Sequence, residues 1–213
     1  MLKEHLTERR HYNMFYLDLF PDDPPGFQAI STSAEWAGWL IAAVPAGANV
    51  EVKRRLKSNL KHILVGLEMK AGLVVPHGER GAGRSVLFEP YCQIMTFEFS
   101  VGVFSVCEGL GSIYHLLSIG NDGGAAPRVA PNDWVAALCR EFDPAGADGL
   151  EVNVRHTKDV RDKIHQDRLG ARADIDWHDF GYGEAFIPAR NALQPLLQKF
   201  ESQVPAATNL LIR

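Results

Sequence analysis

The chain has 213 residues, of which 46% are hydrophobic and 23% are charged, and its formal net charge is −4. A chain of this length can bury one sizeable core without needing a second, so we expect a single domain over residues 1–213. The slightly acidic balance argues against a protein that binds nucleic acid mainly through its net charge, although a local basic face is still allowed.

The three cysteines indicate a reducing compartment. Cys92, Cys107 and Cys139 are odd in number, widely spaced and set in apolar segments without a CxxC pair. This usage is typical of reduced core residues rather than of a disulfide framework or a zinc site. The first twelve residues contain no apolar run of the kind that a signal peptide needs. We therefore expect a cytoplasmic protein.

The N-terminal third predicts three helices. Aromatic and aliphatic residues at helical spacing predict a short helix over 7–20, which the proline-rich run 21–26 ends. Thr32 and Glu35 form a capping box that begins the next helix, in which Trp36 and Trp39 are expected to anchor the core. Residues 49–72 repeat apolar positions every three or four residues and predict a longer amphipathic helix. Its basic opposite side fits a solvated face better than a nucleic-acid surface, because no aromatic residues interleave to stack bases.

A glycine-rich segment follows this helix. Residues 78–85 read GERGAGRS and differ from the phosphate-binding pattern GxxxxGK[ST] in having Arg84 where the lysine belongs. A phosphate-binding loop needs a strand before it and a helix directly after it, and the flanking residues predict neither. A surface loop is the better interpretation.

The most apolar stretch, residues 91–118, predicts one long helix through the centre of a bundle. Glu98 and Glu108 make it too polar to span a membrane, since each would cost about 2.5–3.5 kcal/mol at mid-bilayer. Small residues recur at intervals of three, four and three, which would let another helix approach closely, from the same chain or from a second copy. This expected packing stripe consists of Gly102, Ser105, Gly109 and Ser112.

The remaining segments complete an all-α pattern. Helices are predicted over 132–142, 150–170 and 184–204, the last with a kink at Pro195. Asp174, Asp176, His178 and Asp179 could be metal ligands, but alternating acids in a glycine-containing connector are more typical of a solvated loop. The expected fold is a single-domain helical bundle of five to six helices around a long central apolar helix.

The helix over 150–170 carries a charge where its pattern demands an apolar residue. At about 100° per residue, Leu150, Val154 and Val160 share an arc of about 120°, and Arg161 points into that arc. A guanidinium held against a core needs an acidic partner, because desolvating it alone costs several kcal/mol. Glu98 and Glu108 are the natural candidates, so the sequence predicts a structural ion pair between Arg161 and one of them.

Residues 160–169, VRDKIHQDRL, resemble the arginine-histidine motif of the HEPN superfamily, whose members are small α-helical bundles and often dimers. The resemblance covers about ten residues. It implies metal-independent RNA cleavage of the toxin or phage-defence type, with Arg161, Asp162 and His165 as the catalytic residues. His165 would act as general base on the 2′-hydroxyl, and Arg161 would stabilise charge on the pentavalent phosphorus.

The same residues have a structural explanation. Lys158 with Asp162, and Asp159 with Lys163, are ion pairs at i,i+4, and Arg161 can be a structural cation among them. The alternative function is therefore a non-catalytic dimeric bundle that binds a protein or a small ligand. Under either reading we expect a homodimer, no cofactor, no metal and no membrane, with RNA or another protein as the partner.

Overall fold

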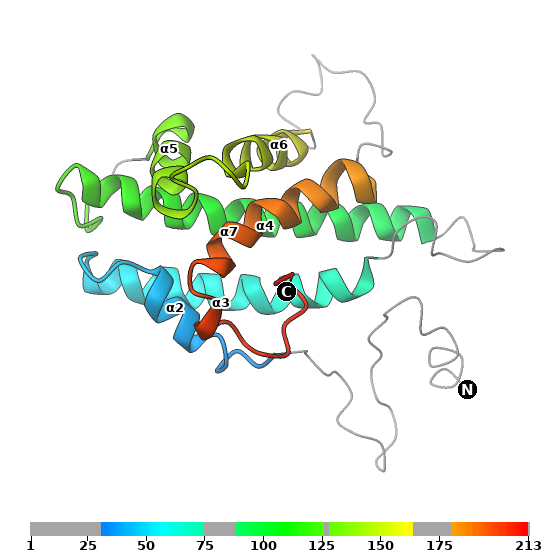
Figure 1. Ribbon diagram of the computed structural model, residues 1–213, viewed down its shortest axis with the longest axis horizontal. Helices are drawn as coiled ribbons and strands as arrows, with labels where there is room; N and C mark the ends of the chain where they lie inside the picture. The colour runs from blue at the N-terminus through cyan, green and yellow to red at the C-terminus, as the bar shows by residue number, and fades with distance from the viewer. Residues whose placement is uncertain (1–30, 75–87, 126–127, 164–179, 213) are drawn as a thin grey trace, which may run out of the picture.

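The computed structural model describes residues 31–74, 88–125, 128–163 and 180–212, and all regular structure in these ranges is helical. The predicted all-α bundle is therefore confirmed (Figure 1). The helices are α2 (Ala37–Ala43), α3 (Val50–Leu73), α4 (Phe88–Ser118), α5 (Pro131–Phe142), α6 (Leu150–Asp162) and α7 (Ile187–Gln198), with a π-helical turn η5 (Tyr182–Phe186) before α7 and a 3-10 turn η6 (Glu201–Gln203) after it.

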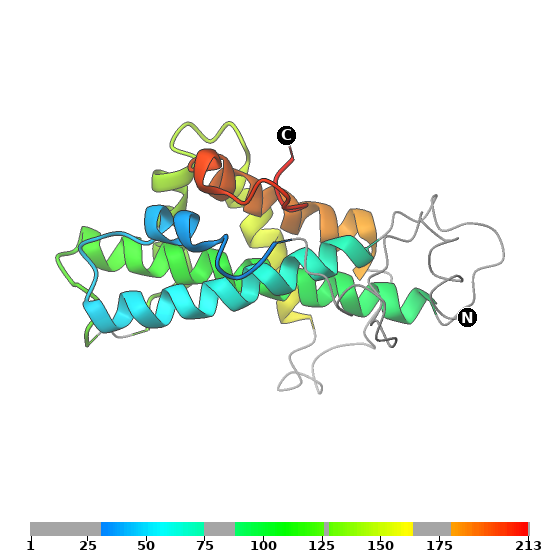
Figure 2. The ribbon, with the colours of Figure 1, turned by 90° about the horizontal axis from the view of Figure 1, so that it is seen from below.

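Helix α4 is the long central helix that the sequence predicts. It lies between α3 on one side and α5 and α6 on the opposite side, while α7 crosses a third side (Figures 1 and 2). Many of its buried residues, among them Phe99, Val103 and Leu110, belong to one large core cluster shared with the other helices.

The apolar character of α4 also raises the question of a membrane. Gln93–Ser118 is long and apolar enough to cross a bilayer, and half of that stretch is buried inside the bundle. The core helix of a soluble protein has the same length and composition. The cytoplasmic location therefore stays a prediction.

One half of the predicted capping box forms, but in the turn before α2, whose N-cap is Trp36 without a side-chain cap. The backbone N–H and the hydroxyl of Thr32 donate to Glu35 Oε2 at 2.6 and 2.8 Å, so Glu35 provides the acceptor for the Thr32 amide. The rings of Trp36 and Trp39 lie edge to face at a centroid distance of 6.0 Å, and neither residue is exposed. Both tryptophans are core anchors, as their spacing predicts.

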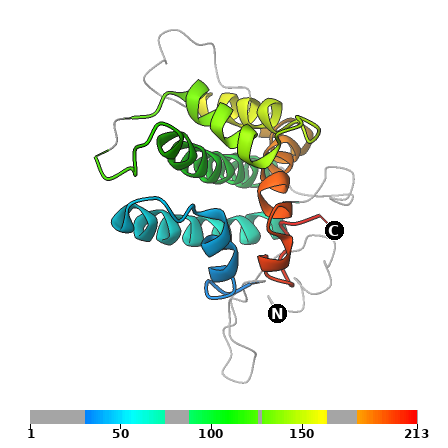
Figure 3. The same ribbon diagram turned by 60° about the vertical axis from the view of Figure 1, so that its left-hand side comes forward.

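Helix α7 ends earlier than the pattern predicts. Pro195 lies inside it and has no N–H to donate to the carbonyl one turn earlier, and the helix stops at Gln198 instead of reaching residue 204. The chain then folds back across α7. The Gln194 amide donates to Leu210 O at 2.7 Å and accepts from the Ile212 N–H at 2.8 Å. Figure 3 shows this C-terminal segment beside α7 and the end of α3.

Candidate functional site

The candidate site lies at the C-terminal end of α6. Leu150, Val154, Thr157 and Val160 are all buried, so the predicted inward face of this helix is confirmed over the described residues. Lys158, Arg161 and Asp162 lie beside that face, and we call these three residues the Arg161 cluster. Arg161 starts within the inward arc, but its long side chain is 37% exposed, so it extends past the core toward solvent.

The Arg161 cluster is built around one carboxylate. Asp162 accepts from Lys158 Nζ at 2.5 Å and from Arg161 Nη1 at 2.8 Å. The Arg161 guanidinium also lies over the Phe104 ring of α4, with Cζ 5.0 Å from the ring centroid, in the geometry of a cation–π contact. The side chain is 37% exposed. A planar cation is thus fixed in place by a ring and a carboxylate while part of it still faces water.

The electrostatics of the cluster favour a charged carboxylate. Partial burial raises the pKa of Asp162, but the hydrogen bonds from Lys158 and Arg161 outweigh burial and leave the pKa below its ordinary value. Asp162 is therefore ionised at neutral pH. Two cations share this one carboxylate, so the cluster keeps a net positive charge that can attract an anion such as a phosphate.

The predicted ion pair between Arg161 and the acids of α4 is wrong. Glu98 Oε2 lies 3.6 Å from Lys70 Nζ of α3, and Glu108 is exposed. Within the described ranges, Arg161 makes its ion pair with Asp162. The physical reason is that Arg161 is not enclosed. A guanidinium that reaches water, stacks on a ring and has an adjacent carboxylate needs no second acid from the core.

The predicted packing stripe divides between two surfaces of α4. A Cβ added to Gly102 would lie 2.8 Å from Leu67, and one added to Gly109 would lie 3.0 Å from Leu56. Both glycines therefore permit the close approach of α3 in the same chain. Ser105 and Ser112 are half-buried, and the Ser105 hydroxyl donates to Val101 O at 2.9 Å within α4.

Several predicted features lie outside the described residues. Among candidate site residues these are His165 and the acidic segment with Asp174, Asp176, His178 and Asp179; among structural elements they are the loop 78–85 and the helix 7–20. Within the parts of the chain that the structure does describe, no group of His, Cys, Asp and Glu side chains could hold a metal ion.

The two described cysteine side chains are poor nucleophiles. Both are free thiols. Cys107 is fully buried, and burial raises its pKa far above the ordinary range. Burial, followed by the carboxylates of Glu151 and Asp143, raises the pKa of Cys139 to about 11. Since the thiolate is the reactive form, neither residue supplies a nucleophile at neutral pH.

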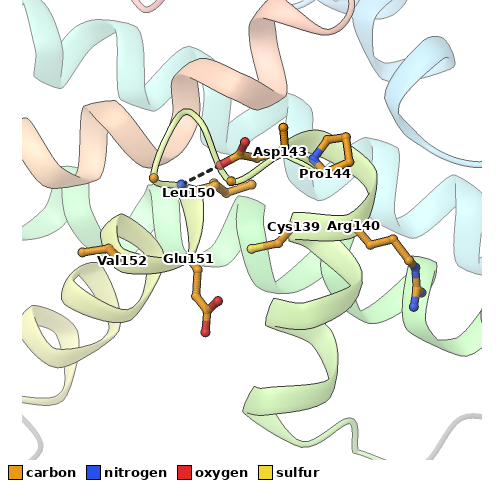
Figure 4. Close-up of a pocket in the computed structure, with 10 residues that line it drawn as sticks. Cys139, Arg140, Asp143, Pro144, Leu150, Glu151 and Val152 are labelled. Atoms are coloured by element: carbon orange, nitrogen blue, oxygen red, sulfur yellow. Dashed lines mark hydrogen bonds between the residues drawn. The ribbon is translucent and has the colours of Figure 1, made fainter.

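A pocket of about 450 Å³ lies where α5 passes into α6 (Figure 4). Among its charged lining residues, Asp143 is the buried one and is 6% exposed. Asp143 Oδ2 accepts from Leu150 N at 3.1 Å, and Oδ1 accepts from Asp148 N at 3.3 Å. Both carboxylate oxygens therefore bind backbone N–H groups at the start of α6. The N-cap residue of this helix is Gly149, which has a φ of 64°. We therefore interpret Asp143 in this pocket as a helix-capping residue and not as a ligand-binding group.

Asp143 should contribute to stability through this cap. We expect Asp143→Ala to lower the free energy of unfolding by about 1–2 kcal/mol, the usual cost of losing a capping side chain. Asp143→Asn keeps one of the two acceptor oxygens, so its loss should be smaller than that of the alanine variant. Urea denaturation of the three proteins measures the difference, and equal stability of the alanine variant and the wild type would contradict the assigned role.

Sequence reasoning missed Phe104 and Asp143. Phe104 is one of many apolar residues in α4, and no pattern within that helix shows which residue of α6 lies above it. Asp143 belongs to the connector DPAGADG, where an acid reads as an ordinary turn residue. An Asp that directly precedes a Gly-rich turn and a new helix is the one signal that could have indicated the cap.

The fold and the Arg161 cluster thus define an all-α bundle with a small basic site on its surface. No family model matches this chain, and neither a curated protein nor a solved structure is significantly similar to it.

Proposed function

We propose that the protein is a metal-independent endoribonuclease related to the HEPN superfamily, in which the Arg161 cluster holds the phosphate to be cleaved. The observation that carries this proposal is the combination of contacts and exposure at the Arg161 side chain. The guanidinium is fixed by Phe104 and Asp162, yet it is 37% exposed and is not sealed by a buried acid. Of its three nitrogens only Nη1 donates to a described residue, which leaves N–H groups for phosphate oxygens.

In this proposal each residue has a defined task. His165, three residues beyond Asp162 in the sequence, takes the proton from the ribose 2′-hydroxyl. The 2′-oxygen then bonds to the adjacent phosphorus and the bond from phosphorus to the 5′-oxygen breaks, with solvent supplying the proton to that oxygen. Arg161 stabilises the extra negative charge on the phosphorus oxygens, and Asp162 fixes the orientation of the guanidinium.

One observation favours the second candidate, a non-catalytic bundle that binds a protein or a small ligand. Lys158 and Arg161 both bind Asp162 at short distance, and such a cluster can simply hold the last turn of α6 together. Under this function Arg161 contributes to helix stability and has no reacting partner.

An RNA cleavage assay in EDTA separates the two functions. Single-stranded RNA is incubated with the wild type, Arg161→Ala, His165→Ala and Arg155→Ala. Arg155 lies on the same helix, is exposed and pairs with Glu151 at 2.8 Å, so its removal changes the net charge equally. We expect the wild type and Arg155→Ala to cleave alike, and Arg161→Ala and His165→Ala to lose about a hundredfold or more, as the removal of an acid-base or charge-stabilising group does.

The result that overturns the proposal is equal cleavage by all four proteins, or none by the wild type. Thermal melting of the same samples guards against misfolding. If Arg161→Ala melts well below the Arg155→Ala control while neither protein changes RNA, the cluster has the structural role of the second candidate.

A further inference from the structure

Among the described residues, one face of α4 carries no buried side chain from residue 94 to residue 119. It consists of residues that alternate at intervals of four and three, and none of them is buried. We call this set the α4 seam: Ile94, Glu98, Val101, Ser105, Glu108, Ser112, His115 and Ile119. Ile119 follows the last helical residue and keeps the helical hydrogen bond to His115 O at 3.3 Å. A repeat of alternating four and three residues is the spacing by which one helix packs along another.

The other three sides of α4 already have partners. Gly102 and Gly109 face α3, and Gly111 faces α5 so closely that an added Cβ would lie 2.5 Å from Trp134 O. Phe99 contacts Phe186 at the start of α7, with ring centroids 4.6 Å apart. The seam is the fourth side. Large apolar side chains stand exposed at both of its ends, Ile94 at 36% and Ile119 at 62%.

We propose that the α4 seam binds the seam of a second copy of this chain in antiparallel orientation. With the two-fold axis passing between Val106 and Cys107, Ile94 faces the partner's Ile119, and Val101 faces the partner's Ser112. Both carboxylates of the seam then meet a hydrogen-bond donor: Glu98 faces the partner's His115, and Glu108 faces the partner's Ser105. The seam is therefore complementary to itself, as a two-fold interface requires.

This complementarity selects the orientation and the register. A parallel pair in register would place Glu98 against the partner's Glu98, and Glu108 against the partner's Glu108. An antiparallel pair with its axis at Val103 would place Glu98 against the partner's Glu108. Like charges brought together at an interface are costly. The proposed register avoids both contacts and also pairs the two exposed isoleucines.

The dimer has a consequence for the Arg161 cluster, and this step alone rests on the proposed function. A two-fold axis perpendicular to the paired helices leaves α6 of both copies on the same side of the interface. Arg161 lies over Phe104. With a helix rise of about 1.5 Å per residue, Phe104 is about 4 Å from the two-fold axis, measured along α4. The two Arg161 clusters then flank a single face, on which one RNA strand can meet both.

The size of the seam sets the expected affinity. From Ile94 to Ile119 it is about 38 Å long and one helix wide, which places it at the small end of specific interfaces. We therefore expect a dimer that dissociates on dilution through the micromolar range.

The test is sedimentation of the full chain over a range of concentrations. Ser105→Glu places a carboxylate against the partner's Glu108 twice in each dimer, and we expect it to raise the dissociation constant at least about tenfold. Adding Glu108→Lys to this variant replaces both repulsive contacts by ion pairs and should restore the dimer. Ala136→Glu, at an exposed position of α5, adds the same charge away from the seam and should change nothing.

Restored dimerisation by the double variant supports the proposed pairing and cannot follow from misfolding of the single one. A wild type that stays monomeric at about 100 μM, well above the dissociation range expected for so small an interface, overturns the proposal. A dimer that Ser105→Glu leaves intact overturns it as well. Because sedimentation needs no RNA, a failed dimer and a failed ribonuclease are distinguished.

Discussion

Replacing Gly111 by alanine should destabilise the protein by about 2–3 kcal/mol, the upper part of the usual range for overpacking, although alanine is the better helix former. Gly111 lies in α4 where α5 crosses it. An added Cβ would lie 2.5 Å from Trp134 O and 2.9 Å from the indole ring. Trp134 is 1% exposed and its ring packs edge to face on Phe104 at 5.5 Å. Neither the backbone of α5 nor a wedged indole can yield cheaply, so α5 must move away from α4.

Gly66→Ala is the matched control. Gly66 lies inside α3, where a Cβ would meet only the flexible end of Lys70 at 3.7 Å. Alanine there should stabilise the protein by up to about 1 kcal/mol, because glycine inside a helix costs that amount. Guanidinium denaturation of the two variants should therefore shift in opposite directions. Stabilisation of both variants would show that the contact between α4 and α5 is looser than described.

Gly111 also shows where a sequence pattern stops being informative. The spacing of Gly102, Ser105, Gly109 and Ser112 predicts a surface on α4 for close approach, and two of these residues do admit α3. The pattern cannot identify the neighbour, because small residues permit an approach from any helix. It therefore grouped the two serines of the α4 seam with the two glycines that face α3, and it omitted Gly111, which has the tightest contact among the described glycines.

The sequence pattern of α6 was likewise informative about burial and uninformative about contacts. Its buried face was predictable, since apolar periodicity reports burial directly. The partner of Arg161 was not, because a long side chain that starts within a buried arc can extend along its helix or over a neighbour. Which of these occurs depends on Phe104, a residue far away in the sequence. The helical period placed the cation, and only the packing of α6 on α4 showed what it contacts.

Helix ends were predicted less well than helices. The spacing of apolar residues in 184–204 continues past the observed end of α7, because apolar residues outside a helix, such as Phe200 and Val204, also pack on the core. The side-chain contacts at helix ends leave no periodic signal. They join residues seven apart, as Asp143 with Leu150, or 16 apart, as Gln194 with Leu210.

Glu68 makes another long-range contact, and its removal should cost about 3 kcal/mol or more. Its side chain is fully buried in α3. Oε2 accepts from the Ser31 N–H at 2.9 Å, and Oε1 accepts from the Ser31 hydroxyl at 2.8 Å. Glu68→Ala leaves two buried donors without an acceptor, at about 1–3 kcal/mol each, and it opens a cavity beside them. Glu68→Gln keeps the side-chain volume and one acceptor, so its loss in urea denaturation should be clearly smaller.

A double-mutant cycle with Ser31→Ala isolates the contact from the cavity. In the wild type, Ser31→Ala leaves Glu68 Oε1 without its donor. In the Glu68→Ala background the same change removes a hydroxyl that has already lost its acceptor, so it should cost at least about 1 kcal/mol less there. Additive losses would mean that Glu68 stabilises the fold through its volume alone. A coupled loss places the carboxylate as the group that binds residue 31 to α3, at the same level where Asn209 of the C-terminal segment donates to Glu68 O at 3.0 Å.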